Sequence, residues 1–366
     1  MLHISANAIQ LLAWKDDLME LGVFTFADVD PSDGIDRGKE AERRMRDLME
    51  EIRLADDVGL DVFGVGEHHR VDYLVSSPAT VLAGAATITK TIRLTSAVSI
   101  LSSDDPVRVF QQFSSVDLLS SGRAEIMAGR GSFIESFPLF GYPLEAYDDL
   151  FSEKLDLLLK IRDNERVTWS GNTRAPLKDQ PVYPRPVQNP LPVWIAAGGT
   201  PQSMARAGFL GLPLIIAILG GQPRRFAPLF DIHRQAGLQA GHDLAKLKRG
   251  ISVHGFLADT AEEAADIFFE PQKAVMDRLG RERGWGPQSR AQFDASMGPE
   301  GALFVGGPED LARKIVAHQR IFGLDRFMIQ FAVGLVPQAQ VLHAIELFGK
   351  KVAPMVREML ADGEPV

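Results

Sequence analysis

Three ionisable side chains, Glu67-His68-His69, directly follow the short apolar run 61–66. The run has the length and the β-branched and aromatic residues of a buried strand. In a parallel α/β fold, the carboxyl end of a strand is where side chains meet a ligand. Histidine titrates near neutral pH and can transfer protons, bind a metal ion or stabilise an oxyanion. This tripeptide is therefore the first candidate for catalysis.

Metal binding by the same tripeptide is less favourable. Successive residues of an extended chain point to opposite sides, so His68 and His69 are poor joint ligands of one ion. His254, in the strand-like run 250–257, is a further candidate, but no third histidine or pair of carboxylates is well placed beside it. We predict no metal site, and a metal-dependent barrel hydrolase using His68 and His254 remains an alternative.

Two further segments have the composition of anion-binding loops. Arg130 has a glycine on each side just past a strand-like run, so the backbone there leaves room for an anionic group. The segment 196–203 combines small residues with a helix start, where free backbone N–H groups can bind a phosphate. The alternatives are a surface arginine in a turn and an ordinary helix start with Thr200 as cap and Pro201 first. In a barrel both segments share a face with His68, so one phosphorylated cofactor could contact all three.

Strand-like and helical patterns alternate along most of the chain. This alternation predicts an α/β fold, a (β/α)₈ TIM barrel, with a doubly wound open sheet as the alternative. Against the open sheet, no G-x-G-x-x-G follows the first strand-like run. The predicted strands are 21–26, 61–66, 93–101, 123–128, 192–197, 212–219, 250–257 and 325–332. The predicted helices are 39–58, 77–90, 106–120, 148–163, 201–209, 223–240, 260–280, 308–322 and 337–360. Long connections at 164–191 and 281–307 have the composition of lids or binding loops.

Composition excludes several classes of protein. The net charge of -9 over 366 residues argues against general nucleic-acid binding, which requires a basic face. The chain has no cysteine, which excludes disulfides, thiolate metal sites and a cysteine nucleophile. No segment offers the ~20 continuous apolar residues that span a bilayer, and 1–18 lacks the basic start and cleavage site of a signal peptide. We therefore expect no membrane association and a cytoplasmic protein. Residues 1–18 are either an extension outside the fold or an ordinary helix, and 19–360 form one predicted domain.

Four segments in a fixed order carry a resemblance to a known family. They are 66–69, 101–108, 118–131 and 192–200. On these segments the chain resembles the bacterial luciferase-like family of flavin-dependent monooxygenases, from about residue 20 to about residue 355. The resemblance implies a (β/α)₈ barrel with an insertion before the last strand, usually dimeric, which holds reduced FMN at the carboxyl ends of the strands.

The resemblance also assigns roles to individual residues. His68 takes the place of the catalytic histidine beside the flavin, with Glu67 or a backbone carbonyl fixing its tautomer. Ala97-Val98 takes the place of a non-proline cis peptide against the flavin ring. Arg130 corresponds to an arginine near the flavin phosphate, and a backbone cradle follows the fifth strand. The implied cofactor contacts are Ala97, Val98, Arg130, Gly198, Gly199 and Thr200.

Three positions depart from luciferase itself. The pair Tyr147-Asp148 stands where luciferase has a second phosphate-binding arginine. Gly198-Gly199 replaces a Glu-Ser pair, and Asp105 replaces a histidine before the Pro-Val-Arg turn. These departures argue against a long-chain aldehyde substrate and light emission, and they leave the flavin site in place.

The implied function is a two-component monooxygenase. A separate NAD(P)H:flavin reductase would supply reduced FMN, and O₂ would form a C4a-peroxyflavin that oxygenates a small organic substrate. One alternative is hydride transfer with the deazaflavin F420 on the same fold, and another is a flavin-binding or storage protein without turnover. A set of aromatic residues suggests an apolar substrate chamber, although core positions explain them equally well: Phe133, Phe137, Phe140, Trp169 and Phe331.

Overall fold

Eight parallel strands close a barrel in the computed structural model, which describes residues 19–32, 37–131 and 133–362. Around the barrel the strands follow the order β12-β1-β2-β3-β5-β8-β9-β10, and β10 pairs with both β9 and β12. This second pairing closes the sheet, so the open-sheet alternative is wrong. The strands are β1 (Glu20–Thr25), β2 (Val62–Val65), β3 (Arg93–Ser96), β5 (Ala124–Gly129), β8 (Val193–Ala197), β9 (Leu214–Ile218), β10 (Arg249–Leu257) and β12 (Arg326–Gln330).

Each of the eight predicted strands has its counterpart in the barrel. The third, expected over 93–101, is divided into β3 and the short β4 (Ser99–Ile100), with a cis peptide at Ala97-Val98 between them. The cis peptide lies where the family resemblance implied it. A further strand beside the barrel was not expected: β11 (Phe304–Gly306) pairs with the end of β10 outside the closed ring.

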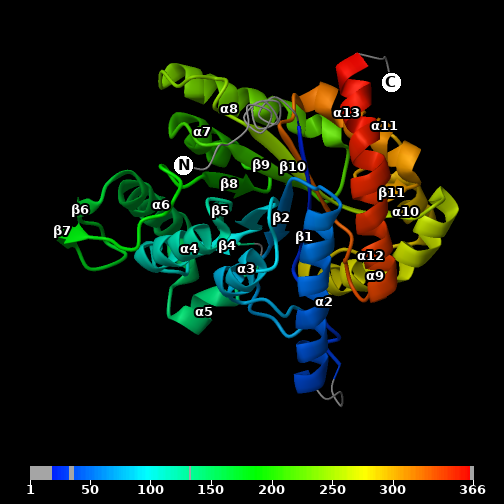
Figure 1. Cartoon of the computed structure of the whole chain (residues 1–366), viewed down its shortest axis with the longest axis horizontal. Helices are drawn as coiled ribbons and strands as arrows, with labels where there is room; N and C mark the ends of the chain where they lie inside the picture. The colour runs from blue at the N-terminus through cyan, green and yellow to red at the C-terminus, as the bar shows by residue number, and fades with distance from the viewer. Residues whose placement is uncertain (1–18, 33–36, 132, 363–366) are drawn as a thin grey trace, which may run out of the picture.

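Helices form the outer layer around the strands (Figure 1). Three predicted helices match to the residue, namely α4 (Pro106–Ser120), α7 (Pro201–Phe209) and α11 (Pro308–Phe322). Local chemistry explains α4, because the Asp105 carboxylate accepts hydrogen bonds from the Val107 and Arg108 N–H groups. The other helices are α2 (Arg37–Asp57), α3 (Pro78–Ala86), α5 (Ser136–Phe140), α6 (Tyr147–Asp163), α8 (Ala227–Gln239), α9 (Ala261–Arg283), α10 (Arg290–Met297), α12 (Gln338–Leu347) and α13 (Ala353–Asp362). Short helical turns are η1 (Leu144–Ala146), η2 (Pro223–Phe226) and η3 (Phe348–Val352).

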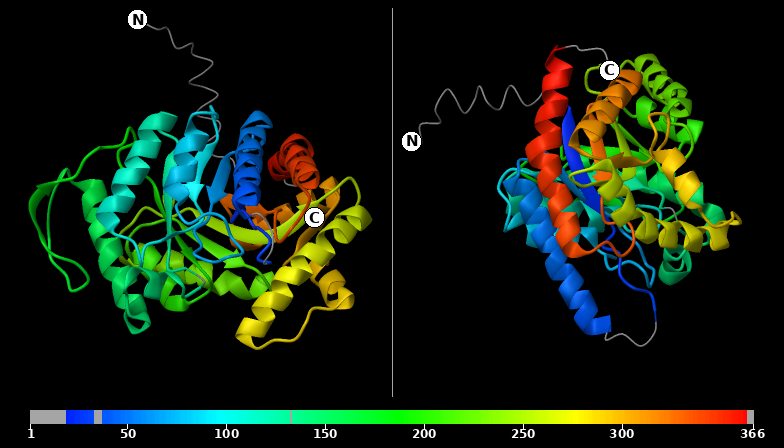
Figure 2. Two further views of the ribbon diagram at one scale, coloured as in Figure 1. Left: turned by 90° about the horizontal axis from the view of Figure 1, so that it is seen from below. Right: turned by 90° about the vertical axis from the view of Figure 1, so that its right-hand side faces the viewer.

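The two long connections adopt different structures. Segment 164–191 contains an antiparallel hairpin, β6 (Arg166–Trp169) with β7 (Leu177–Pro181), which extends from the side of the barrel (Figures 1 and 2). Segment 281–307 contains the end of α9, α10 and β11, and so supplies much of the insertion expected before the last strand. The sequence predicted neither the hairpin nor α10.

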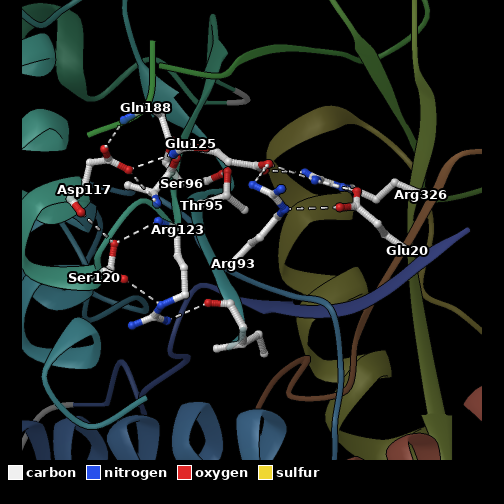
Figure 3. Close-up of polar contacts among 12 residues, drawn as sticks. Glu20, Arg93, Thr95, Ser96, Asp117, Ser120, Arg123, Glu125, Gln188 and Arg326 are labelled. Atoms are coloured by element: carbon white, nitrogen blue, oxygen red, sulfur yellow. Dashed lines mark hydrogen bonds and ion pairs between the residues drawn. The ribbon is translucent and has the colours of Figure 1, made fainter. Parts of the chain in front are cut away.

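The interior of the barrel is layered. Near mid-height, six buried apolar side chains form one cluster: Phe24, Val62, Met127, Trp194, Ile215 and Met328. Toward the amino ends of the strands, the Arg326 guanidinium lies 4.1 Å from the centre of the Trp194 ring. There Arg326 joins Glu20, Arg93 and Glu125 in a network of ion pairs (Figure 3). The apolar cluster and this network therefore occupy the barrel interior toward the amino ends of the strands.

Within the described residues, no helix is long and apolar enough to cross a membrane. The expected extension, residues 1–18, lies outside the described residues, so the domain division at residue 19 stays a prediction.

Candidate functional site

A cavity of about 550 Å³ opens at the carboxyl ends of the strands. Its floor belongs to the apolar cluster, because Phe24, Met127 and Met328 contribute to both. Every strand of the barrel supplies at least one lining residue, from within the strand or just beyond its carboxyl end: Phe24, His68, Ala97, Met127, Ala196, Ala217, His254 and Met328. This is the face on which barrel enzymes carry their active sites.

The cavity brings together most of the residues singled out from the sequence. Its lining contains Glu67, His68, Ala97, Val98, Arg130, Gly198 and Thr200. Gly199 does not line the cavity, and its φ of 118° lies in the region that favours glycine. A Cβ built on Gly198 would meet no atom within 4 Å, so the missing side chain there leaves open space.

His68 is held in an aromatic pocket. Its ring is 6% exposed and packs against Phe26, Tyr73 and Phe133, with centroid distances of 4.4, 4.5 and 5.0 Å. Burial is the main cause, and the nearby positive charge of Arg70 a further cause, of a pKa lowered to about 3. The imidazole is therefore neutral at pH 7. Its Nε2 atom is buried without a hydrogen-bond partner among the described residues, as expected of a group that awaits a ligand.

Glu67 is bound elsewhere. Its carboxylate forms a 2.8 Å hydrogen bond with His69 Nε2, and the Ile100 N–H donates to its other oxygen at 2.9 Å. Both carboxylate oxygens are thus engaged away from His68, so Glu67 is not the partner that fixes the His68 tautomer, and a backbone carbonyl stays the other prediction. The carboxylate instead ties the loop after β2 to strand β4.

His254 also lines the cavity, from strand β10. It is 6% exposed, and burial lowers its pKa to about 4, so this imidazole is also neutral at pH 7. Across the part of the chain that the structure describes, no group of three or more potential ligand side chains is arranged to hold a metal ion. A metal site built on His68 and His254 has no support from this geometry.

Arg130 lies at the mouth of the cavity beside the first turn of α7. Its Nη2 atom is 3.5 Å from Thr200 Oγ1 and 3.4 Å from Ser203 Oγ, which are long for hydrogen bonds. Thr200 is the N-cap residue of α7, as the alternative interpretation expected, but its hydroxyl makes no cap hydrogen bond. A cation, two hydroxyl groups and a helix N-terminus therefore converge, which is the composition of a phosphate site.

Tyr147 and Asp148, which stand where luciferase has a second phosphate-binding arginine, have a structural role at this mouth. Asp148 accepts a 2.5 Å hydrogen bond from Arg130 Nη1, and the Tyr147 ring lies 4.8 Å below the same guanidinium. The Tyr147 hydroxyl donates to the Gly131 carbonyl at 3.2 Å. Sequence reasoning noted this pair but missed that it orients Arg130.

None of the five aromatic residues suggested for a substrate chamber lines the cavity. Three of them are buried in the core, as the alternative expected: Phe137, Trp169 and Phe331. Phe140 is half-exposed, and Phe133 covers His68. The aromatic lining residues are instead Phe24, Phe26, Tyr147 and Phe226. No residue of 164–191 lines the cavity, whereas Arg283 of segment 281–307 does.

The barrel thus combines a mouth with the composition of a phosphate site and a buried, neutral histidine in one cavity. Residues 19–325 match the family described as luciferase-like monooxygenase. The chain belongs to the luciferase-like monooxygenase family.

Individual relatives divide between two cofactors. The N-acetyl-S-alkylcysteine monooxygenase of Bacillus subtilis is 26% identical over 314 residues, 81% of this chain and 89% of the relative. The oxygenating constituent of 3,6-diketocamphane monooxygenase from Pseudomonas putida, solved with FMN, superposes with a TM-score of 0.74 at 20% identity, covering 92% of this chain and 98% of that one. An F420-dependent secondary alcohol dehydrogenase superposes with a TM-score of 0.70 at 17% identity, covering 93% and 99%. These similarities establish the fold, and a flavin and F420 are both compatible with it.

Proposed function

We propose that this protein is a monooxygenase that binds reduced FMN, supplied by a separate NAD(P)H:flavin reductase, and uses O₂ to oxygenate a small organic substrate. The observation that carries the proposal is the pairing of two features in one cavity. Arg130 and the N-terminus of α7 lie at its mouth, and the neutral, unpartnered His68 lies in its wall. A cofactor with a phosphate at one end and a reactive ring at the other fits this pairing.

The mouth fits the phosphate of FMN. Arg130, Thr200 and Ser203 would bind it, together with the N–H groups at the start of α7. Asp148 is 70% exposed on its side chain, so it can turn into solvent when an anion takes its place beside Arg130. The protein carries a net charge of -9, so this local arrangement has to supply the attraction.

The inner wall fits a flat aromatic ring. Ala97, Val98 and Met127 supply apolar surface to the cavity and would hold the ring. When bound, reduced FMN supplies the electrons and activates O₂. The surrounding residues would exclude water, and the unpartnered Nε2 of His68 would offer a donor or an acceptor, according to the tautomer, without carrying a charge. Glu67 holds the loop that carries His68 and is proposed as a positioning residue.

Hydride transfer with F420 is the second candidate, because an F420-dependent enzyme shares the fold. The acidic tail of F420 would call for a basic channel, whereas Arg130 and Arg283 are the two cationic side chains among the described residues of the lining. FMN is therefore preferred. Homodimer formation and a cytoplasmic location stay predictions.

Anaerobic titration with reduced FMN, reduced riboflavin and reduced F420 tests the cofactor assignment. We expect FMN to bind most tightly, since riboflavin lacks the phosphate that Arg130 would hold. In Arg130→Gln, FMN affinity is expected to fall about ten- to a hundredfold, the range for a lost hydrogen bond to a charged group, with riboflavin affinity unchanged. Tighter binding of F420 than of FMN would contradict the proposal.

Asp148→Asn is the matched variant, because it removes the carboxylate that competes for Arg130. FMN affinity is expected to rise about threefold, a small effect because exposed ion pairs are weak. Riboflavin affinity should not change. Opposite effects of the two substitutions on FMN alone would locate its phosphate at this mouth. A similar loss of riboflavin affinity in Arg130→Gln would instead mean that Arg130 acts on the shape of the cavity.

A further inference from the structure

A second cavity, of about 710 Å³, lies outside the ring of eight strands, and we call it the outer cavity. Its lining comes from η2, the start of α9, the segment after α10, β11 and α11. The helices α9, α10 and α11 lie on the side of the barrel away from the hairpin β6–β7 (Figure 1). No described residue lines both this cavity and the one at the carboxyl ends of the strands. A volume of this size suits a small organic ligand.

Lys314 holds one wall of the outer cavity in place. Its ammonium group donates three hydrogen bonds to backbone carbonyls, at 3.0 Å to Met297, 2.8 Å to Gly298 and 2.7 Å to Leu303. The segment after α10 is therefore fastened to α11 at three points, so the cavity is preformed. Because an ammonium group has three N–H donors, these bonds also occupy the whole hydrogen-bonding capacity of Lys314.

The other charged side chains of the lining have partners within the protein. Arg224 lies 3.6 Å from Glu300, and both are exposed. Arg313 forms an ion pair with Glu309. The carboxylate of Asp310 accepts a hydrogen bond at 3.0 Å from a backbone N–H group at the start of α11. The described part of the lining thus presents paired charges, which favours a neutral ligand over an ion.

Apolar side chains make up much of the remaining lining. They come from every element around the cavity, and they are Pro223, Ala261, Met297, Pro299, Val305, Leu311, Ala317 and Ile321. Burial of an apolar ligand surface against such residues is favourable by about 25 cal/mol per Å². The body of the ligand should therefore be apolar.

His318 supplies an unpartnered hydrogen-bond acceptor to this lining. The residue is 2% exposed, and its ring meets the Phe304 ring edge to face at 4.9 Å. Its Nδ1 atom lies 2.7 Å from the Lys314 carbonyl oxygen, which can only accept, so Nδ1 carries the proton. Burial lowers the pKa of His318 to about 4, so the ring is neutral at pH 7 and Nε2 is an acceptor.

The Nε2 atom of His318 is buried without a hydrogen-bond partner among the described residues. A buried acceptor without a partner costs free energy, which a donor on a bound molecule would recover. We propose that the outer cavity is a second binding site, for a neutral, apolar molecule that carries a hydroxyl group, a phenol or an aliphatic alcohol. The hydroxyl group donates to His318 Nε2, and the apolar body packs along α11 against Ala317 and Ile321. This site goes beyond the proposed function and does not depend on it, because none of its residues is assigned to FMN.

Calorimetric titration of the whole chain with 4-butylphenol and with 4-butylanisole tests this assignment. The two probes share an apolar body, but the methyl ether has no O–H group to donate. Ala317→Phe fills the outer cavity from α11, so the binding heat that this variant loses belongs to the outer cavity. For that binding, we expect the phenol to bind about fivefold more tightly than the ether, the effect of one neutral hydrogen bond.

Two histidine variants complete the design. His318→Phe keeps an aromatic ring beside Phe304 and removes the acceptor, so it should bind the phenol and the ether equally. His68→Phe is the matched control, because His68 is also a buried, neutral histidine but lines the other cavity. It should keep the preference for the phenol.

Three results would overturn the inference. They are equal affinities of the wild type for the phenol and the ether, an unchanged binding heat in Ala317→Phe, and loss of the preference in His68→Phe. In the last case the probes would occupy the cavity assigned to FMN. The comparison of the two probes in the wild type keeps the test decisive if a variant does not fold. Failure of the protein to bind FMN would count against the proposed function and leave this inference standing.

Discussion

Replacing His68 with alanine is expected to leave the affinity for reduced FMN within about threefold of wild type and to lower the oxygenation rate by about a hundredfold or more, the usual contribution of a positioned acid–base group. The reason is the place of the ring: it is buried against Phe26, Tyr73 and Phe133 and lines the cavity, whereas the proposed phosphate contacts are Arg130, Thr200 and Ser203. Binding and turnover would be measured on the same preparations, by anaerobic titration and by reductase-coupled product formation.

Two variants separate the chemistry of His68 from its packing. His68→Phe fills the aromatic pocket without nitrogen atoms, and we expect it to be as inactive as His68→Ala. His68→Asn keeps a hydrogen-bond donor and should retain part of the rate. Because burial lowers the pKa of His68 to about 3, the wild-type rate should show no ionisation step from this residue near neutral pH. Full activity in His68→Phe would remove His68 from the mechanism.

Arg326→Met is expected to lower the free energy of unfolding by about 3–5 kcal/mol, the cost of removing one partner from a buried ion pair. Arg326 is 1% exposed, and its guanidinium donates two hydrogen bonds to Glu125, at 2.7 and 3.1 Å, and one to Glu20, at 2.7 Å (Figure 3). Without it, Glu125 stays buried and its remaining ion pair is the longer one to Arg93, at 3.4 Å. Urea unfolding followed by tryptophan fluorescence measures the loss, and Trp194 lies directly against the substituted side chain.

The double variant Glu125→Gln/Arg326→Met is the control for this cluster. Removing both charges should cost less than Arg326→Met alone, because no uncompensated carboxylate is left at Glu125. The surface pair of Arg166 with Asp179 is the matched exposed case, and Asp179→Asn should leave the unfolding midpoint unchanged. A double variant less stable than Arg326→Met would contradict this description of the cluster.

The cluster also predicts a pH dependence of stability. Arg326 holds the pKa of Glu125 below its ordinary value of 4.5, despite the opposing effect of burial. A carboxyl group with a lowered folded-state pKa stabilises the fold above its unfolded pKa, and this contribution is lost as the pH falls through the folded value. Wild type should therefore lose stability more steeply in acid than Glu125→Gln does.

The barrel was predictable because its strands are buried on both faces and therefore form apolar runs that stand out from the helical patterns. The same property located His68 and Arg130, since each follows directly on such a run. The hairpin β6–β7 was missed because its strands are short and mostly exposed. Segment 164–191 therefore has the composition of a loop and lacks the regular spacing of apolar residues that indicates a strand.

The contacts between the residues of the site were harder to predict from the sequence than the identity of those residues. The pairing of Glu67 with His69 depends on how the loop after β2 turns, which spacing along an extended chain does not determine. The roles of Tyr147 and Asp148 depend on the start of α6 meeting the loop after β5. Phe331 and Phe133 are the same residue type, yet one is core and the other covers His68, and only the register and path of the chain decide between them.

Incorporation of labelled oxygen tests the central claim most directly. The protein would be incubated with a flavin reductase, NADH, FMN and ¹⁸O₂, and with a panel of carboxylates, sulfonates, aldehydes, ketones and sulfides. We predict a product that carries one ¹⁸O atom, formed by wild type and not by His68→Phe, and not formed when F420 and its own reductase replace FMN. A substrate that is reduced or oxidised with F420 and gains no ¹⁸O would contradict the account and assign the cavity to hydride transfer.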